Sequence, residues 1–187
     1  MPIKAVKEHI HDHFSNNIIS KHLNHHFINI TEIKLENEYS KLSFKQFNFK
    51  DIDKCTRLFK EVFSDYPWYD DWVSEDQARN YLIELIENPV FKGFIVYKSK
   101  EIAAVCFGHT RSWWMGKEFF IDEFFVSPKI QGNGIGTKLM DFVKNSLKEE
   151  SYKRLVLLTN KDIPAEDFYI KNSFYAKKNR ISMVNEL

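Results

Sequence analysis

Hydrophobic and polar positions repeat with two different periods along residues 42–187, and the two periods predict different elements. Apolar residues at helical spacing predict a helix over 51–63, with Asp51 as its N-cap, and a second helix that starts at Ser74 or Glu75 and ends near Pro89. The other expected helices are 134–148 and 165–171, and the expected strands are 43–49, 91–97, 102–108, 118–126, 154–159 and a last group between 174 and 184. This order predicts the α/β class, with one mixed sheet and helices on both of its faces.

The first forty residues differ from the rest of the chain in composition. They contain six of the seven His and none of the Gly. The spacing of His9, His11 and His13 would place three imidazoles on one face of a strand, and such a set can bind zinc or nickel. No Cys and no clearly placed carboxylate completes this metal site, so we expect that no metal binds. We interpret 1–40 as a His-rich N-terminal extension that precedes one domain over 41–187.

Composition sets limits on the function. Hydrophobic residues make up 43% of the chain and aromatic residues 16%, which is enough for the core of one domain. A net charge of +1 provides no overall basic field, so we expect no nucleic-acid partner. Cys55 and Cys106 lie in apolar surroundings and are expected to be buried free thiols in a reducing compartment. No signal sequence opens the chain and no apolar run is long enough to cross a bilayer, so the expected location is cytoplasmic, away from the membrane.

Three glycines, Gly132, Gly134 and Gly136, alternate with other residues where an apolar strand gives way to a helix. Such a turn lets the backbone approach a ligand closely, and the helix N-terminus favours a phosphate group. A Walker A loop would end in Gly-Lys-Ser/Thr, whereas Gly136 is followed by Thr137 and Lys138. The G-x-G-x-G spacing also differs from the G-x-G-x-x-G of dinucleotide-binding folds. The glycines alone therefore fit a bare helix N-terminus as well as a phosphate site.

The residues around these glycines resemble the acetyl-CoA loop of the GNAT superfamily of N-acetyltransferases. The resemblance rests on the pattern Val126-x-Pro128-x-x-Gln131-Gly132-x-Gly134-Ile135-Gly136-x-x-Leu139, in which Gln131 occupies the position of the Arg or Gln that opens the family motif. A second segment, 164–174, resembles the family's N-x-x-A-x-x-F-Y-x-x-x-G-F, and the likeness covers roughly 42–187. Asp162 replaces the usual Asn, and we expect it still to cap the helix. Ser173 replaces the usual Gly, which suggests a different turn conformation there.

The resemblance implies a GNAT-like fold that uses acetyl-CoA as co-substrate. In that family the pantetheine arm pairs with the strand backbone at the positions of Phe125 and Val126, and the N–H groups of the loop hold the pyrophosphate. The other cofactor-binding residues that it implies are Gln131, Gly132, Asn133, Gly134, Ile135, Gly136, Thr137 and, in the second segment, Ala165. A homodimer is also expected from the resemblance, because these folds often pair through their last strands.

Acetyl transfer to an amine requires a base that takes a proton from the ammonium. Asp122 and Glu123 lie inside the apolar run 119–126, and neighbouring residues of a strand face opposite sides, so one of them is expected to face the cleft. The run Ile-Asp-Glu-Phe-Phe-Val is similar to the acidic strand of diamine acetyltransferases. That similarity implies Asp122 as the base and Glu123 as a contact of the polycation. The alternative is a pair of surface charges on a half-exposed strand.

The departing thiolate requires an acid, and Tyr169 is the candidate. It matches the tyrosine of the family's Phe-Tyr pair, whose phenol protonates the CoA sulfur. The alternative is a core tyrosine on an amphipathic helix, and Tyr175 is a weaker candidate for the acid.

Aromatic and acidic residues alternate over 65–72, between the first two expected helices. Aromatic faces and carboxylates together suit a cationic amine, and the expected acceptor-binding residues are Tyr66, Trp68, Asp71 and Trp72. The alternative makes Trp68 and Trp72 core anchors and the Asp residues turn formers. Trp113 and Trp114, at another hairpin, would close the same cleft or pack in a dimer interface.

These interpretations favour one function over two others. The leading hypothesis is an N-acetyltransferase that moves an acetyl group from acetyl-CoA to a primary amine of a small cationic acceptor, such as a polyamine, an aminoglycoside or an amino-acid-like amine. The second is a protein N-terminal or lysine acetyltransferase. The third is a non-catalytic acetyl-CoA-binding module, against which the presence of Asp122, Glu123 and Tyr169 argues.

Overall fold

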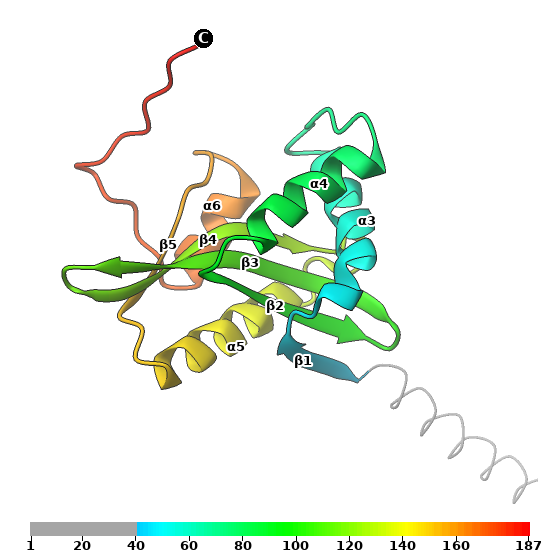
Figure 1. Ribbon diagram of the computed structural model, residues 1–187, viewed down its shortest axis with the longest axis horizontal. Coiled ribbons are helices and arrows are strands. Elements are labelled where there is room, and N and C mark those ends of the chain that lie inside the picture. The colour runs from blue at the N-terminus through cyan, green and yellow to red at the C-terminus, as the bar shows by residue number, and fades with distance from the viewer. Residues whose placement is uncertain (1–40) are drawn as a thin grey trace, which may run out of the picture. The chain divides into compact units, whose positions relative to one another are not determined.

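The computed structural model describes residues 41–187 of the chain. Within that range, five strands form one sheet in the order of the sequence, β1-β2-β3-β4-β5 (Figure 1). The strands are β1 (Leu42–Gln46), β2 (Phe91–Lys98), β3 (Glu101–Trp113), β4 (Gly116–Val126) and β5 (Arg154–Leu157). Neighbouring strands are antiparallel from β1 to β4, whereas β4 and β5 are parallel. The prediction of a mixed α/β sheet is confirmed.

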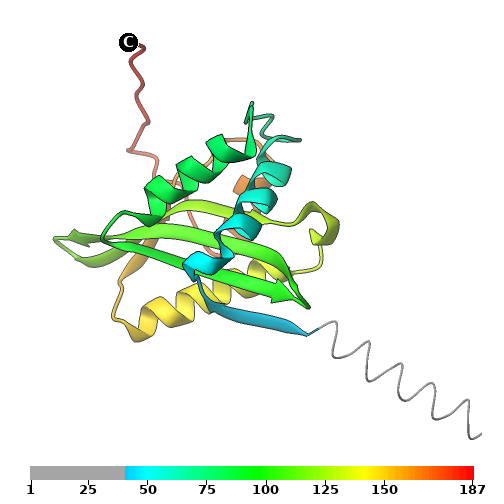
Figure 2. The same cartoon turned by 45° about the vertical axis from the view of Figure 1, so that its right-hand side comes forward.

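Helices cover both faces of this sheet, as the sequence predicted. The helices α3 (Ile52–Phe63) and α4 (Glu75–Ile86) pack on one face, and α5 (Ile135–Glu149) and α6 (Pro164–Lys171) pack on the other. Figure 2 shows α3 and α4 on one side of the sheet and α5 on the opposite side. The short 3-10 turns η1 (Phe49–Asp51) and η2 (Pro128–Ile130) precede α3 and α5. The central strands are thus buried on both faces, which explains their nearly continuous apolar sequences.

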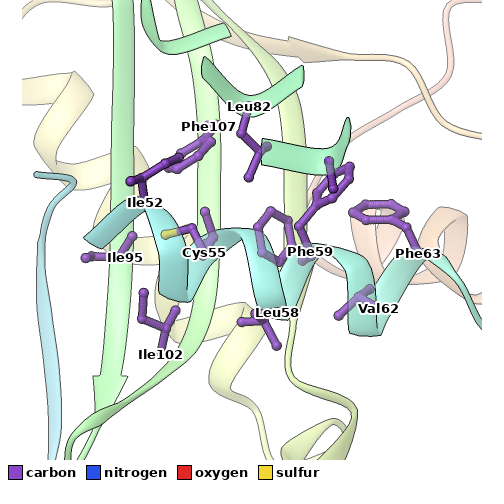
Figure 3. Close-up of a cluster of buried hydrophobic side chains, with 13 residues drawn as sticks. Ile52, Cys55, Leu58, Phe59, Val62, Phe63, Leu82, Ile95, Ile102 and Phe107 are labelled. Atoms are coloured by element: carbon purple, nitrogen blue, oxygen red, sulfur yellow. The ribbon is translucent and has the colours of Figure 1, made fainter. Parts of the chain in front are cut away.

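Each face of the sheet has its own hydrophobic core. On the α3/α4 face, Phe59 is 1% exposed and lies in a cluster with Cys55, Leu82 and Phe107 (Figure 3). On the α5/α6 face, α5 buries Leu139, Met140, Val143 and Leu147, whose spacing places them in one stripe of the helix. Burying a side chain of this size stabilises the fold by about 1.5–3 kcal/mol, so these two clusters hold the helices against the strands that carry the site.

Two expected side-chain caps are not formed, although Asp51 is the N-cap residue of α3 by position. The carboxylate of Asp51 is buried and accepts a hydrogen bond of 2.7 Å from the hydroxyl of Tyr97, because the helical path already begins at η1, where Asn48 accepts from the N–H of Lys50. Asp162 has φ 62 and its side chain caps nothing; its N–H instead donates to the carboxylate of Glu166, a bond of 2.6 Å. The predicted start of the second helix at Ser74 or Glu75 is confirmed: α4 begins at Glu75, and the hydroxyl of Ser74 accepts from the N–H of Gln77.

The chain after α6 also differs from the prediction. Residues 174–187 form no strand, and beyond Phe174 all of them are exposed, so β5 is an edge strand of the described sheet. The stretch from Lys177 to Arg180 is polar and interrupts the alternation that would bury one face of a strand. Ser173 takes φ 68, the left-handed conformation that glycine favours, so the different turn conformation suggested for this position is not found.

Candidate active site

The register between strands β3 and β4 shifts at the acidic pair, Asp122 and Glu123. Phe107 lies opposite Glu123, but the next residue, Gly108, lies opposite Ile121, which leaves Asp122 as an extra residue on β4. This is a β-bulge. It requires Gly108, because a Cβ there would collide with the carbonyl oxygen of Phe120 on the neighbouring strand.

The bulge resets the alternation of side chains along β4. Ile121 belongs to the core on the α5/α6 face, whereas Phe125, an even number of residues away, belongs to the core on the α3/α4 face. Asp122 and Glu123 therefore both lie on the α3/α4 face, and the charges of both act on Tyr81 of α4. The prediction that only one of them faces this side is wrong, because it assumed an unbroken strand period.

The same point of β4 marks the end of its pairing with β5. The parallel ladder runs from Glu118 opposite Arg154 to Ile121 opposite Leu157, and there it stops. From Asp122 to Val126, β4 continues with no strand beside this edge among the described residues. The strands separate where the acidic pair lies, so an extended ligand can pair with the free backbone of β4 next to two carboxylates.

Glu123 lies beneath α4 and is held by Tyr81. The phenol of Tyr81 donates to Oε1 of Glu123 over 2.5 Å. Burial raises the pKa of Glu123 to about 7; the hydrogen bond from Tyr81 opposes this rise, and the charges of Asp122 and Asp70 add to it. A carboxyl group with such a pKa exchanges its proton near neutral pH, as a general base must.

Asp122 is held by a different partner. Its Oδ2 lies 2.7 Å from Nδ1 of His109 on β3, and the imidazole packs against Phe120 with ring centroids 5.3 Å apart. The side chains of His109 and Asp122 are 24% and 18% exposed, respectively, so the pair is confined but open to solvent. Both carboxylates thus have one fixed hydrogen-bond partner each.

The glycine loop follows directly from the end of β4. The amide of Gln131 donates to the carbonyl of Val126 over 3.0 Å and so ties the loop to the strand. Gly132 and Gly134 have φ 78 and φ 73, and a Cβ at either would meet no atom within 4 Å. Gly134 is the N-cap of α5 and no side chain caps the helix, so N–H groups of its first turn stay available to an anion.

The remaining predicted residues of the cofactor site lie around this turn. Ile135 is buried, Asn133 and Thr137 are exposed, and Ala165 is half-buried in the first turn of α6. Gly136 has a different role from the other two glycines, because a Cβ there would lie 3.1 Å from Cε2 of Phe168 and 3.3 Å from Cγ2 of Val126. Its lack of a side chain lets α5 pack closely on the end of β4 and on α6.

Tyr169 lies on the α5/α6 face, in a cluster of aromatic rings. It packs against Phe124, Phe168 and Phe174, with centroids 5.3–6.3 Å apart. Burial raises the pKa of Tyr169 well above its ordinary value, and the charges of Cys106 and Glu123 raise it further. The phenol is therefore protonated at neutral pH, as an acid for a thiolate must be. Tyr175, the weaker candidate, is 79% exposed beyond α6.

The aromatic and acidic segment 65–72 has both buried and exposed members. Trp68 packs on Phe63, and Trp72 packs on Phe59 and on Tyr81, the partner of Glu123. The buried indole Nε1 of Trp72 makes no hydrogen bond within the part of the chain that the structure describes. By contrast, Tyr66 is 66% exposed and Asp71 is also exposed.

The two indoles thus anchor the segment to α3, while its acids face solvent. At the β3–β4 hairpin, Trp113 is opposite Gly116 and Trp114 is 84% exposed.

Residues 41–187 contain no group of three or more His, Cys, Asp and Glu side chains that could hold a metal ion. The candidate metal ligands His9, His11 and His13 lie outside the described residues. None of the helices in the described range is long and apolar enough to span a bilayer.

Comparisons with known proteins agree with this geometry. Residues 52–174 match the Acetyltransferase (GNAT) family, a match that includes the bulge, the loop and Tyr169. The chain belongs to this family. It is therefore an acyltransferase of the kind that uses acetyl-CoA, and its GNAT fold is the one expected from the sequence. No curated protein has a sequence that matches it.

Solved structures of other GNAT acetyltransferases show the same fold. An aminoglycoside acetyltransferase from an uncultured soil metagenomic sample, in complex with trehalose, is 20% identical with a TM-score of 0.61, over 78% of this chain and 96% of that one. AAC(6')-Iy in complex with the bisubstrate analogue CoA-S-monomethyl-acetylneamine is 14% identical with a TM-score of 0.61, over 79% and 99%. Ribosomal-protein-alanine N-acetyltransferase from Brucella melitensis biovar Abortus 2308 is 14% identical with a TM-score of 0.59, over 79% and 99%.

Two residues of this GNAT site were not singled out from the sequence. Tyr81 has the spacing of a core residue on an amphipathic helix, and nothing local distinguishes it. His109 carries a usable signal, since it is the sole His of the described range and directly follows the apolar run 102–108 of β3. A titratable group in such a position is unusual enough to mark a candidate site.

Proposed function

We propose that this GNAT acetyltransferase moves the acetyl group of acetyl-CoA to a primary amine of a small cationic acceptor. The acceptor classes that fit are polyamines, aminoglycosides and amino-acid-like amines. The observation that supports this most strongly is the bulge at Asp122, which brings two carboxylates to one face of the sheet beside the free edge of β4. An ammonium group is the natural ligand for two carboxylates in a half-buried position.

The loop after β4 supports the assignment of acetyl-CoA. Gly132 and Gly134 leave open space where side chains would otherwise stand, and the uncapped first turn of α5 has N–H groups for a pyrophosphate. We assign this contact to the backbone of residues 131–137. Phe125 and Val126, on the free stretch of β4, would pair with the pantetheine arm and place the thioester near Glu123.

The described residues suggest how the chain would perform the transfer by direct attack. The carboxylates of Asp122 and Glu123 would bind the ammonium and remove its proton, and the free amine would attack the thioester carbonyl carbon. Tyr169 would protonate the thiolate, since burial keeps its hydroxyl protonated. A backbone N–H at the free edge of β4 would polarise the carbonyl. The exposed acids of the segment 65–72 would attract the cationic acceptor.

A protein N-terminus or a lysine is the second candidate acceptor. The likeness to the ribosomal-protein-alanine N-acetyltransferase favours it, since that enzyme shares the fold over nearly its whole length. The likeness to aminoglycoside acetyltransferases, one of them in complex with sisomicin, favours a small molecule. A non-catalytic acetyl-CoA-binding module would not need the pair of carboxylates.

Location and oligomeric state stay predictions. Cys55 and Cys106 are both buried free thiols, which fits the expected cytoplasmic location. The outer edge of β5 supports the homodimer, because it has no neighbouring strand within 41–187 and an unpaired strand edge can pair with a second chain.

An assay of thiol release from acetyl-CoA, with a panel of polyamines, aminoglycosides, amino acids and basic peptides, tests the proposal. Turnover on one class of small amine is the expected result. Turnover on peptides alone would favour the second candidate. Tight binding of acetyl-CoA with no turnover on any amine would contradict the proposed activity.

A further inference from the structure

His109 takes no part in the mechanism above, although it is the closest partner of Asp122. Its Nδ1 lies 2.7 Å from Oδ2 of that carboxylate. The ring is also fixed by Phe120, which faces it across the two strands at 5.3 Å. Since about a quarter of the side chain is exposed, the imidazole is both held in place and accessible.

The contact with Asp122 determines which ring nitrogen is free. An ionised carboxylate can only accept hydrogen bonds, so Nδ1 must donate, and the lone pair of a neutral ring is then on Nε2. Within residues 41–187, Nε2 makes no hydrogen bond. A carboxylate that orients an imidazole in this way also stabilises the imidazolium that forms when Nε2 takes up a proton. The geometry is that of a base with its orienting carboxylate.

We propose that His109 is the base that takes the proton from the acceptor ammonium, and that Asp122 is a positioning residue that holds the imidazole. This inference rests on the proposed function. It assigns the two carboxylates different tasks, because Glu123, held by Tyr81, would then bind the ammonium while Asp122 acts through His109.

The protons and bonds balance in this scheme. The ammonium gives one proton to Nε2 of His109, and the free amine attacks the thioester carbon. A C–N bond forms and the C–S bond breaks. Tyr169 gives its hydroxyl proton to the departing thiolate, and the nitrogen of the new amide gives its second proton to the Tyr169 phenolate. The imidazolium of His109 then releases its proton to solvent. One proton is released for each acetyl group transferred.

The charged groups around His109 are consistent with this task. Asp122 and Glu123 on β4 are acidic groups on the same face, and the phenol of Tyr81 on α4 donates to Glu123. Arg111, two residues along β3, is the basic group nearby, and its guanidinium lies 4.3 Å from the centre of the same Phe120 ring.

The first test is His109→Asn in the full-length protein. The amide can still donate to Asp122 but cannot act as a base, so the strand contact survives while the proposed chemistry does not. We expect kcat/KM to fall by roughly 10²–10⁴-fold and the acidic limb of the pH profile to change, with the affinity for acetyl-CoA unchanged in calorimetry. Thr110→Val is the matched control: it removes a 2.5 Å bond to Tyr152 on the other face of the same strand and should leave the rate unchanged.

The second test separates proton transfer from a structural role. His109→Ala should regain part of its activity when imidazole is added, and a series of substituted imidazoles should give rates that rise with the pKa of the added base. A purely structural role would not produce that dependence. A wild-type rate and pH profile for His109→Asn would overturn the inference, as would His109→Ala that no imidazole rescues.

The two proposals fail in different ways. If the wild-type protein releases no thiol with any amine of the panel, the proposed function is wrong and the role of His109 is wrong with it. If the wild-type protein turns over and His109→Asn turns over equally well, the function stands and only the role of His109 is refuted.

Discussion

The hydroxyl of Tyr81 on α4 donates a 2.5 Å hydrogen bond to Oε1 of Glu123 on β4. The two residues are 42 positions apart in the chain, and their contact joins the helix layer to the strand beside the proposed thioester site. Burial raises the pKa of Glu123 to about 7, so a small change in pH or in nearby charge alters the fraction of this carboxyl group that is ionised. An incoming ammonium would favour the ionised form and strengthen its own binding.

Glu123→Gln should stabilise the protein at alkaline pH. The pKa of Glu123 rises from 4.5 to about 7 on folding, so the folded state binds the proton more tightly. The contribution of this pKa difference to the free energy of unfolding is up to about 3 kcal/mol. It is fully present below pH 4.5 and is lost as the pH rises through 7. The Gln amide cannot ionise, so the free energy of unfolding of the variant, relative to that of the wild type, should increase from pH 5 to pH 8. Denaturant unfolding measures this difference. Glu84→Gln, exposed on the same helix as Tyr81, is the control; an equal difference at all pH values would contradict the raised pKa.

Gly134→Val should weaken acetyl-CoA binding at least tenfold in calorimetry. Its Cβ branches would occupy the open space in which we place the pyrophosphate. Because Gly134 has φ 73, the substitution should also cost about 1–2 kcal/mol of stability, seen as a lower Tm. Gly134→Asn tolerates the left-handed conformation better and controls for that strain. Affinity equal to that of the wild type would refute the assignment of the loop.

Gly136→Ala should destabilise the fold by about 1–3 kcal/mol, since its methyl group would press on the rings and methyls that pack there. The nearest atoms are Cε2 of Phe168 at 3.1 Å and Cγ2 of Val126 at 3.3 Å. The double variant with Phe168→Leu should recover part of the loss, because the smaller side chain makes room. Denaturant unfolding gives the free energies of unfolding of the wild type, the two single variants and the double variant. Strict additivity of the two single losses would contradict the packing explanation.

Tyr169→Phe should lower kcat by about 10²–10⁴-fold while acetyl-CoA still binds. The ring contacts with Phe124, Phe168 and Phe174 remain in the variant, so stability should change little. Steady-state kinetics and calorimetry measure the two effects separately. Tyr175→Phe, at an exposed position, should have no effect. Unchanged turnover of Tyr169→Phe would remove the acid role.

Local patterns predicted most of the elements and the loop. The helices α3–α6 and the strands β1–β5 lie where the periods of apolar residues place them, within a few residues, and Gln131 and Gly134 were singled out correctly as loop residues at the start of a helix. The side-chain caps expected from Asp51 and Asp162 and the strands expected after 174 were wrong, and for Asp51 the reason is a partner from elsewhere in the fold. The Tyr97 hydroxyl that binds Asp51 is such a partner.

The sequence by itself determined the order of helices and strands, the family and the position of the glycine loop, since these depend on neighbours within a few residues. Only the tertiary structure decided that Asp122 and Glu123 share one face, because the bulge arises from the pairing of β3 with β4, with Gly108 against the Phe120 carbonyl. The same pairing brings His109 to Asp122, and the packing of α4 on the sheet brings Tyr81 to Glu123. Contacts between strands and helices far apart in the chain set the chemistry of the acidic pair, and no period within one segment encodes them.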